Sequence, residues 1–209
     1  EKIEPLDSPN YLRLIFDDGK RLKAPAFKVV ELGLTIGAEV SPEDFLALEN
    51  AQSFASCKER AVRILTASGL SKKELQKRLV QKGESEEDAQ AAVSWLEELH
   101  LIDDLETAKQ LVRSANLRGY GRARAKSILY EKGIPKELWD EALSEFGETD
   151  GAIDAFLRKK LSGKTLDQKT IKKAVDALIR RGHSYHDIQE GLRRLEADCE
   201  PIDTWEDME

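Results

Sequence analysis

Apolar residues recur at intervals of three and four along most of this chain, the spacing of helices that bury one face. The clearest case is segment 167–181, which we predict to be a strongly amphipathic helix. Its apolar positions fall within about 100° of a helical wheel: Ile171, Ala174, Val175 and Leu178. Its basic positions fall on the opposite side, with Asp176 the only acid among them: Lys169, Lys172, Lys173 and Arg180.

A seven-residue pattern occurs three times at nearly constant spacing. The copies are L-V-Q-K-G-E-S at 79–85, L-Y-E-K-G-I-P at 129–135 and L-I-R-R-G-H-S at 178–184. Their glycines, Gly83, Gly133 and Gly182, lie 50 and 49 residues apart. Each glycine follows an amphipathic stretch, so we expect it to adopt a positive φ and to end a helix. A period of this length indicates one supersecondary unit repeated in tandem.

The predicted fold class is mainly α, with three tandem three-helix repeats in an elongated curved array after a small N-terminal arm. The expected helices span 53–67, 71–82 and 85–99, then 103–117, 121–132 and 135–146, then 149–161, 167–181 and 184–196. The expected domains are an arm at 1–52, repeats at 53–101, 102–147 and 148–196, and an acidic tail at 197–209. Ser71 with Glu74 has the spacing of a capping box.

The first 50 residues have a different pattern. Residues 11–16 are bulky and apolar, and Asp18-Gly19 is a strong hairpin signal before a return strand that begins at Leu22. A short helix is expected over 25–32, and Ser41 before Pro42 reads as the start of another helix. The arm is therefore predicted to be a β-hairpin with short helices.

Charge is unevenly distributed around a formal net charge of −7. Residues 84–106 hold nine acids and 196–209 hold seven, with no Lys or Arg in either segment. Residues 118–136 hold six basic residues against Glu131 alone, and 158–181 hold nine against two acids. This asymmetry favours local basic faces, although solvated helix faces explain the charges equally well.

Two basic clusters are the only functional chemistry that the residues suggest. The first is Arg118-Gly119-Tyr120-Gly121-Arg122, followed by Arg124 and Lys126. Two glycines before a helix expose backbone N–H groups, so this cluster is a candidate phosphate or carboxylate site. The alternative is an inter-helix turn that needs small residues. The second cluster is the basic face of segment 167–181, which fits an anionic partner or a solvated face.

Enzymatic functions are disfavoured. His183 and His186 lack further metal ligands, and capping near Ser184 explains their position. Asp103 and Asp104 fit the start of a helix better than a catalytic pair. No nucleophile elbow, P-loop or zinc spacing occurs, so we predict no enzyme activity and no cofactor. No segment resembles a membrane helix or a signal peptide, and two separated cysteines, Cys57 and Cys199, fit a reducing cytoplasm.

The chain resembles the RecX family, which regulates RecA recombinase, over about residues 55–196. The middle repeat carries the resemblance through Leu101-Ile102-Asp103-Asp104, Ala108, Arg118-Gly119-Tyr120-Gly121, Ile128-Leu129 and Lys132-Gly133-Ile134. The first repeat is similar through Arg60-Ala61, Leu65, Ser71, Glu74-Leu75, Leu79 and Lys82-Gly83, and the third through Arg181-Gly182, Ile188 and Leu192. Members tend to have an aromatic residue where this chain has Glu84 and His183, so we expect those junctions to pack differently.

The resemblance implies a regulator that binds RecA filaments on DNA and mainly inhibits ATP hydrolysis, strand exchange and co-protease activity in DNA repair and the SOS response. We expect a monomer in the cytoplasm, with no membrane partner and with weak or filament-dependent contact to single- and double-stranded DNA. The residues expected to bind the filament are Arg118, Arg122, Arg124, Lys126, Lys169, Lys172, Lys173 and Arg180. Two alternatives stay open: an autonomous helical DNA-binding protein, whose affinity would fall steeply with salt, and a protein–protein adaptor indifferent to DNA.

Overall fold

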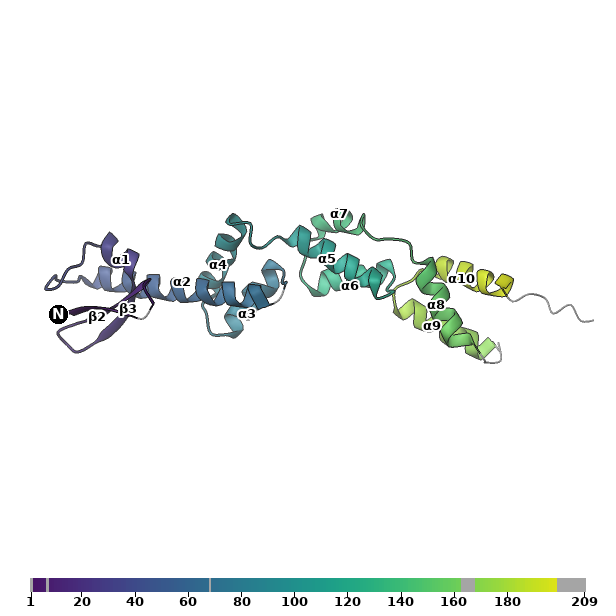
Figure 1. The fold of residues 1–209 in the computed structure, drawn as a ribbon, viewed down its shortest axis with the longest axis horizontal. Coiled ribbons are helices and arrows are strands. Elements are labelled where there is room, and N and C mark those ends of the chain that lie inside the picture. Colours follow the sequence, from purple (N-terminus) through teal and green to yellow (C-terminus); the bar gives the residue numbers. More distant parts are fainter. Residues whose placement is uncertain (1, 7, 68, 163–167, 199–209) are drawn as a thin grey trace, which may run out of the picture. The chain divides into compact units, whose positions relative to one another are not determined.

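The computed structural model describes residues 2–6, 8–67, 69–162 and 168–198. The chain forms two compact units, Glu1–Ile102 and Asp103–Glu209. The described residues are mainly helical, with one small antiparallel sheet near the N-terminus (Figure 1). The predicted fold class is confirmed in its mainly helical composition and its N-terminal β-element.

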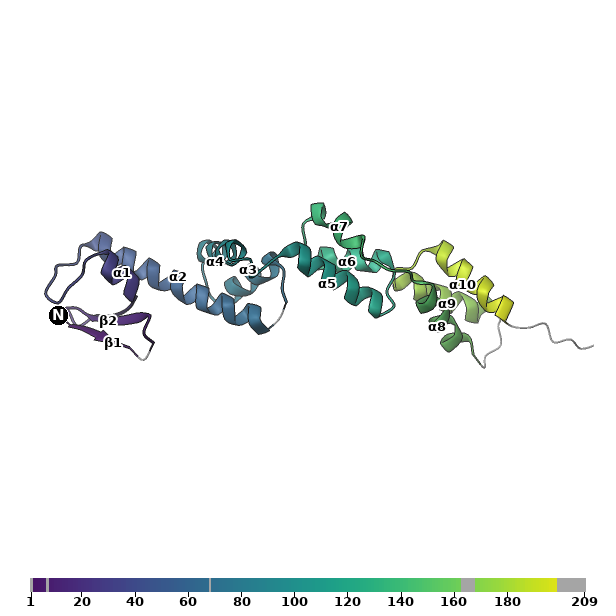
Figure 2. The same cartoon turned by 45° about the horizontal axis from the view of Figure 1, so that its top comes forward.

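The sheet of the first unit has three antiparallel strands in the order β1-β2-β3. β2 (Tyr11–Ile15) and β3 (Arg21–Pro25) form the predicted hairpin, and the Lys20 N–H donates to Asp18 Oδ1 in its turn at 2.9 Å. β1 (Lys2–Pro5) pairs with the other side of β2 (Figure 2) and was not predicted. Four residues that include a proline are too short to show an alternating pattern.

Two helices pack on one face of this sheet. α1 (Ala26–Glu31) and α2 (Pro42–Ala67) contribute Val29 and Leu48 to a core shared with Leu14 and Ala24. The predicted start of α2 is confirmed, because Ser41 Oγ accepts the Asp44 N–H at 3.0 Å. The helix expected from residue 53 is therefore only the second half of α2, which continues across the predicted 52/53 limit. No glycine or proline occurs between residues 43 and 67 to interrupt it.

The second half of α2 packs with α3 (Lys72–Gln81) and α4 (Glu86–Glu98) in a three-helix group. The predicted cap at Ser71 is confirmed, because Ser71 Oγ accepts the Glu74 N–H at 3.1 Å. Gly83 has the expected positive φ, 94°. The core of this group is Cys57, Ala61, Leu70, Leu75, Leu79, Ala89, Ala92, Val93, Leu96 and Ile102.

The second unit begins with α5 (Asp104–Leu117) and α6 (Arg122–Glu131). The single helix expected at 135–146 is wrong: a 3-10 turn, η1 (Lys136–Leu138), precedes a short helix, α7 (Trp139–Leu143). Side chains engage the backbone at both ends, since Trp139 Nε1 donates to the Ile134 carbonyl at 3.0 Å and Ser144 Oγ to the Glu141 carbonyl at 2.6 Å. The core of this group is Ala108, Val112, Ala115, Ala125, Leu129, Ile134, Ala142 and Leu143.

The last group consists of α8 (Asp150–Leu161), α9 (Gln168–Arg180) and α10 (Tyr185–Asp198). Its buried residues are Ile153, Leu157, Leu161, Ala174, Leu178 and Ile188. An ion pair joins α10 to α8, because the Arg194 guanidinium lies 2.9 to 3.1 Å from the Asp154 carboxylate. The limits predicted for the domains stay predictions, and the acidic tail predicted at 197–209 lies almost wholly outside the described residues.

Within the described ranges, none of the helices is both long enough and apolar enough to cross a membrane.

Candidate basic interaction surface

α9 presents a basic face to solvent because its apolar residues are used in the core. Ala174 and Leu178 are buried, and Val175 packs against the same cluster. The four predicted cations are exposed: Lys169, Lys172, Lys173 and Arg180. Among the described residues none of these four forms an ion pair, so their charge is available to a partner.

The cations of the first predicted cluster are less uniform. Arg122 Nη1 donates to the Leu143 carbonyl at 3.2 Å, and Arg124 Nη1 lies 2.8 Å from Glu131 Oε1. The Arg122 guanidinium thus joins α6 to α7, and the Arg124 guanidinium is engaged within α6. Arg118 and Lys126 are exposed and form no ion pair within the described part of the chain. Lys126 and Arg118 are therefore the cations of this cluster that remain available.

Backbone hydrogen bonds from the start of α6 to the end of α9 bear on the anion site considered above. The Gly121 N–H donates to the Arg181 carbonyl at 2.9 Å, and the Ala123 N–H donates to the Gly182 carbonyl at 3.2 Å. Backbone groups from the end of α9 therefore occupy amides that an anion would need. Two amides of the candidate phosphate site, those of Gly121 and Ala123, are therefore not available to an anion, which favours the alternative of a turn that needs small residues.

Close backbone contact explains the glycines at this junction. A Cβ atom on Gly121 would lie 2.1 Å from the Gly182 carbonyl oxygen, and one on Gly182 would lie 2.2 Å from the Arg124 amide nitrogen. Gly182 also has a φ of 87°, which L side chains rarely adopt. The third copy of the seven-residue pattern thus ends a helix and also packs directly against the preceding repeat.

Arg181 was not among the predicted site residues, yet it connects the two repeats. Its Nη2 donates to the Arg118 carbonyl at 2.7 Å and its Nε to the Gly119 carbonyl at 3.3 Å. Its guanidinium also lies over the rings of Tyr120 and Phe156, at 5.2 and 5.5 Å. The signal was present, because the other two copies have lysine at this position, and only arginine has a planar fork of donors that also stacks.

His183 is the second residue of this junction, and its contact with the preceding repeat was not predicted. Its Nε2 lies 3.1 Å from the Gly119 carbonyl oxygen, and only 6% of its surface is exposed. Burial lowers the pKa of His183 below its usual value, and the nearby Arg181 charge lowers it further, while the Gly119 hydrogen bond and Asp187 oppose the shift. His183 is thus a packing residue whose burial favours the neutral ring. The expectation that this junction differs from the family pattern stays a prediction.

The structure brings one end of each basic cluster together. Arg181 follows Arg180 in the chain and donates to the carbonyl groups of Arg118 and Gly119. These contacts place Arg118 beside the end of α9. Lys169, Lys172 and Lys173 lie along the rest of α9. The two clusters therefore belong to one pair of interlocked repeats, although Lys126 and Lys169 are 43 positions apart in the chain. We call these exposed cations the α9 basic surface: Arg118, Lys126, Lys169, Lys172, Lys173 and Arg180.

The remaining polar candidates have structural roles. Asp103 caps α5, because its Oδ1 accepts the Leu105 N–H at 2.7 Å. Ser184 caps α10 by accepting the Asp187 N–H at 3.1 Å. Within the described ranges no group of three or more His, Cys, Asp or Glu side chains could hold a metal ion. Cys57 is buried, and desolvation raises its pKa to about 11, while Cys199 lies outside the described residues.

Glu84 occupies the corresponding place in the first repeat. Its Oε1 lies 2.6 Å from Arg60 Nε of α2, and the Glu84 side chain is only 10% exposed. This ion pair joins α2 to the start of the α3–α4 loop. The expectation that this junction packs differently from that of relatives stays a prediction.

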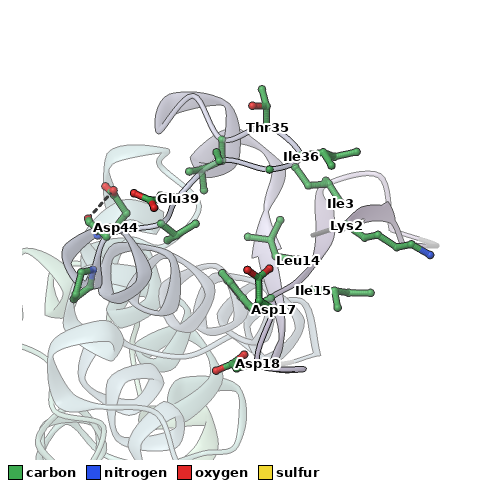
Figure 3. Close-up of a pocket in the computed structure, with 17 residues that line it drawn as sticks. Lys2, Ile3, Leu14, Ile15, Asp17, Asp18, Thr35, Ile36, Glu39 and Asp44 are labelled. Atoms are coloured by element: carbon green, nitrogen blue, oxygen red, sulfur yellow. Dashed lines mark hydrogen bonds between the residues drawn. The ribbon is translucent and has the colours of Figure 1, made fainter.

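A hollow of about 920 Å³ lies in the first unit, between the sheet and the loop before α2 (Figure 3). Its carboxylates include Asp18, which pairs with Lys20 at 3.1 Å, and Asp44, which accepts the Ser41 hydroxyl at 2.7 Å. Figure 3 shows these acids on separate sides of the opening. They do not converge on one point as a catalytic pair would.

Tandem three-helix groups with an exposed basic helix are typical of a class of helical binding proteins. Comparison with known proteins shows the family of this chain. Residues 57–96 match the model of the first three-helix domain of RecX, and residues 103–143 match the second. Regulatory protein RecX of Vibrio parahaemolyticus is 32% identical over 139 residues, which cover 66% of this chain and 90% of that protein. This chain belongs to the RecX family of regulatory proteins.

Longer relatives align over most of the chain. Regulatory protein RecX of Clostridium perfringens strain SM101 is 25% identical over 195 residues, 89% of this chain and 90% of that protein. A crystal structure of a regulatory protein RecX has the same fold, with a TM-score of 0.76 at 21% identity over 90% of this chain and 97% of that one. The family is regulatory and not catalytic, as the sequence predicted.

Proposed function

We propose that this protein binds RecA filaments on DNA and inhibits their ATP hydrolysis, strand exchange and co-protease activity. Membership of the RecX family supports a recombinase as the partner. The observation that carries the binding mode is the α9 basic surface, whose exposed cations form no ion pair within the described part of the protein. In a chain with a net charge of −7, such a surface favours an anionic partner.

The mode of action follows from where these cations lie. They come from α9 and from the region at the start of α6, which Arg181 and the backbone hydrogen bonds hold together. A rigid basic surface loses little conformational entropy when it binds. We infer that it contacts DNA phosphates or acidic protein surface along the filament, while the cores of the two repeats keep its geometry.

The test is a charge-reversal variant, Lys172→Glu, Lys173→Glu and Arg180→Glu, titrated into preformed RecA filaments on single-stranded DNA while ATP hydrolysis is followed. The three side chains are exposed, so we expect a folded protein. The concentration needed for half-inhibition should rise about tenfold, which corresponds to about 1.4 kcal/mol.

A matched control carries the same charge change on exposed residues of α2 and α3: Arg63→Glu, Lys73→Glu and Lys77→Glu. This control should inhibit like the unmodified protein. Equal inhibition by the folded α9 variant and the unmodified protein would refute the assigned surface. No inhibition by the unmodified protein would instead refute the regulatory mechanism and favour an autonomous DNA-binding protein.

A further inference from the structure

The outward face of the N-terminal sheet concentrates basic side chains that neither the family comparison nor the repeats account for. The strand register determines which residues share a face. Lys2 pairs with Ile15, and Ile15 with Arg21, so these three form one row across the sheet. Glu4 pairs with Arg13, and Arg13 with Lys23, which makes the next row on the same face.

The opposite face of the sheet is the apolar one. Ile3, Leu12, Leu14, Leu22 and Ala24 all belong to the core shared with α1 and α2. Because side chains alternate along a strand, the rows that contain Arg13 and Arg21 must point away from this core. The burial pattern agrees: Lys2, Arg13, Arg21 and Lys23 are exposed. We call this face, defined by Lys2, Arg13, Arg21 and Lys23, the basic sheet face.

Two acids lie near these charges: Glu4 in the same row, and Glu59 of α2, which is hydrogen-bonded to Tyr11. Glu4 lies 3.8 Å from Arg13 Nη1, with both side chains 40% or more exposed, so this pair is long and solvated. Lys2 and Arg21 form no ion pair within the described residues. Lys23 Nζ lies 3.7 Å from the centre of the Tyr11 ring, which fixes the ammonium group without neutralising it.

The basic sheet face ends at Tyr11, which is buried. Tyr11 is only 3% exposed, and burial together with a hydrogen bond to Glu59 of α2 raises its pKa to about 12. No exposed aromatic ring of the sheet therefore lies on this face to stack with bases. A flat array of cations without such a ring suits a phosphodiester backbone, because phosphate contacts need charge and donors but carry no sequence information.

We propose that the basic sheet face binds the phosphate backbone of nucleic acid, independently of the α9 basic surface. Adjacent rows are about 6.8 Å apart and neighbouring strands about 4.8 Å apart, so the four cations offer a two-dimensional array. Arg13 and Arg21 provide planar, multi-donor groups, and Lys2 and Lys23 provide point charges. This binding goes beyond the proposed function, since it needs no recombinase.

The experiment measures binding of the full chain to fluorescent oligonucleotides without recombinase, by anisotropy, over a range of salt concentrations. The variant Arg21→Glu, Lys23→Glu should bind about tenfold more weakly at low salt. The slope of log affinity against log salt should fall by about 1.4 on single strands, for two lost phosphate contacts. Oligo-dT and oligo-dA should respond alike, because phosphates carry no sequence information.

The matched control is the double variant Lys73→Glu, Lys77→Glu, which makes the same charge change on exposed residues of α3. This variant should bind DNA like the unmodified chain. Equal loss in both variants would overturn the proposal, since only net charge would then matter. At about 20 mM salt, exposed charges are only weakly screened. Undetectable DNA binding by the unmodified chain under this condition would also overturn the proposal. Normal DNA binding with weaker filament binding would overturn it in favour of an acidic protein surface. Inhibition of ATP hydrolysis is a separate readout, so the proposed function can fail or hold independently.

Discussion

Single residues decide how the second and third repeats meet. Arg181 donates to two carbonyl groups of the preceding repeat and stacks on two aromatic rings, and Gly121 and Gly182 permit the close backbone approach. Their positions follow the periodic pattern, but their partners lie about 60 residues away in the chain. The junction therefore depends on residue types that local periodicity alone would treat as ordinary helix ends.

His183 makes this junction sensitive to pH. Its folded-state pKa lies below that of the unfolded chain, because burial and Arg181 disfavour the charged ring. The unfolded state then binds more protons, so the free energy of unfolding should be constant above about pH 6.5 and fall as the pH decreases below it. Urea unfolding of the full chain between pH 5 and 7.5, followed by circular dichroism, measures this dependence.

The control for this prediction is His183→Gln, whose amide can still donate to the Gly119 carbonyl but does not titrate. It should show a flatter pH dependence than the unmodified chain, and His186→Gln, at an exposed histidine, should not. The same slope for His183→Gln and the unmodified chain would rule out His183 as the titrating group.

At the scale of elements, helix ends were predicted more accurately than helix continuity. The caps at Ser41, Ser71 and Asp103 were recognised from their residue types, and each accepts a backbone N–H as expected. α2, in contrast, extends through a limit that was inferred from a change in composition. Caps are local interactions within four residues, whereas continuity through residue 52 depends on two cores that the same helix serves.

The cap of α5 yields a prediction for one element. Asp103→Ala removes the acceptor for the Leu105 and Glu106 N–H groups and should lower the free energy of unfolding of the second unit by about 1 kcal/mol. Asp103→Asn keeps an acceptor and should retain most of that stability. Hydrogen exchange of α5 amides gives the free energy directly, and unchanged exchange in Asp103→Ala would contradict the role of this cap.

At the scale of the whole molecule, separate cores lead to separate stabilities. The described residues form distinct hydrophobic clusters, with Leu75 in one of the first unit and Leu157 in one of the second. Each cluster buries its own apolar surface, which supplies most of the stability of its unit.

Leu157→Ala should therefore destabilise its own unit selectively. Creating a cavity at a fully buried leucine costs about 2–5 kcal/mol. Hydrogen exchange followed by mass spectrometry should show faster exchange in α8, α9 and α10, with α3 and α4 unchanged. Leu75→Ala should give the reverse pattern. Equal acceleration in both units by either variant would show that the chain unfolds as one cooperative body.

The sequence by itself determined the helical class, the repeat period, the helix caps and the amphipathic character of α9, because these depend on interactions within a few residues or on a pattern of burial along one element. It also identified the exposed cations of the α9 basic surface. Only the tertiary structure decided which donors remain available. The Gly121 and Ala123 amides at the start of α6 donate to the end of α9, and the strand register places Lys2, Arg13, Arg21 and Lys23 on one face. The hydrogen bonds of α6 and the pairing of β1 join segments that are separate in the chain, and local periodicity does not specify such pairings, whereas the β2–β3 hairpin was already indicated by its turn and strand pattern.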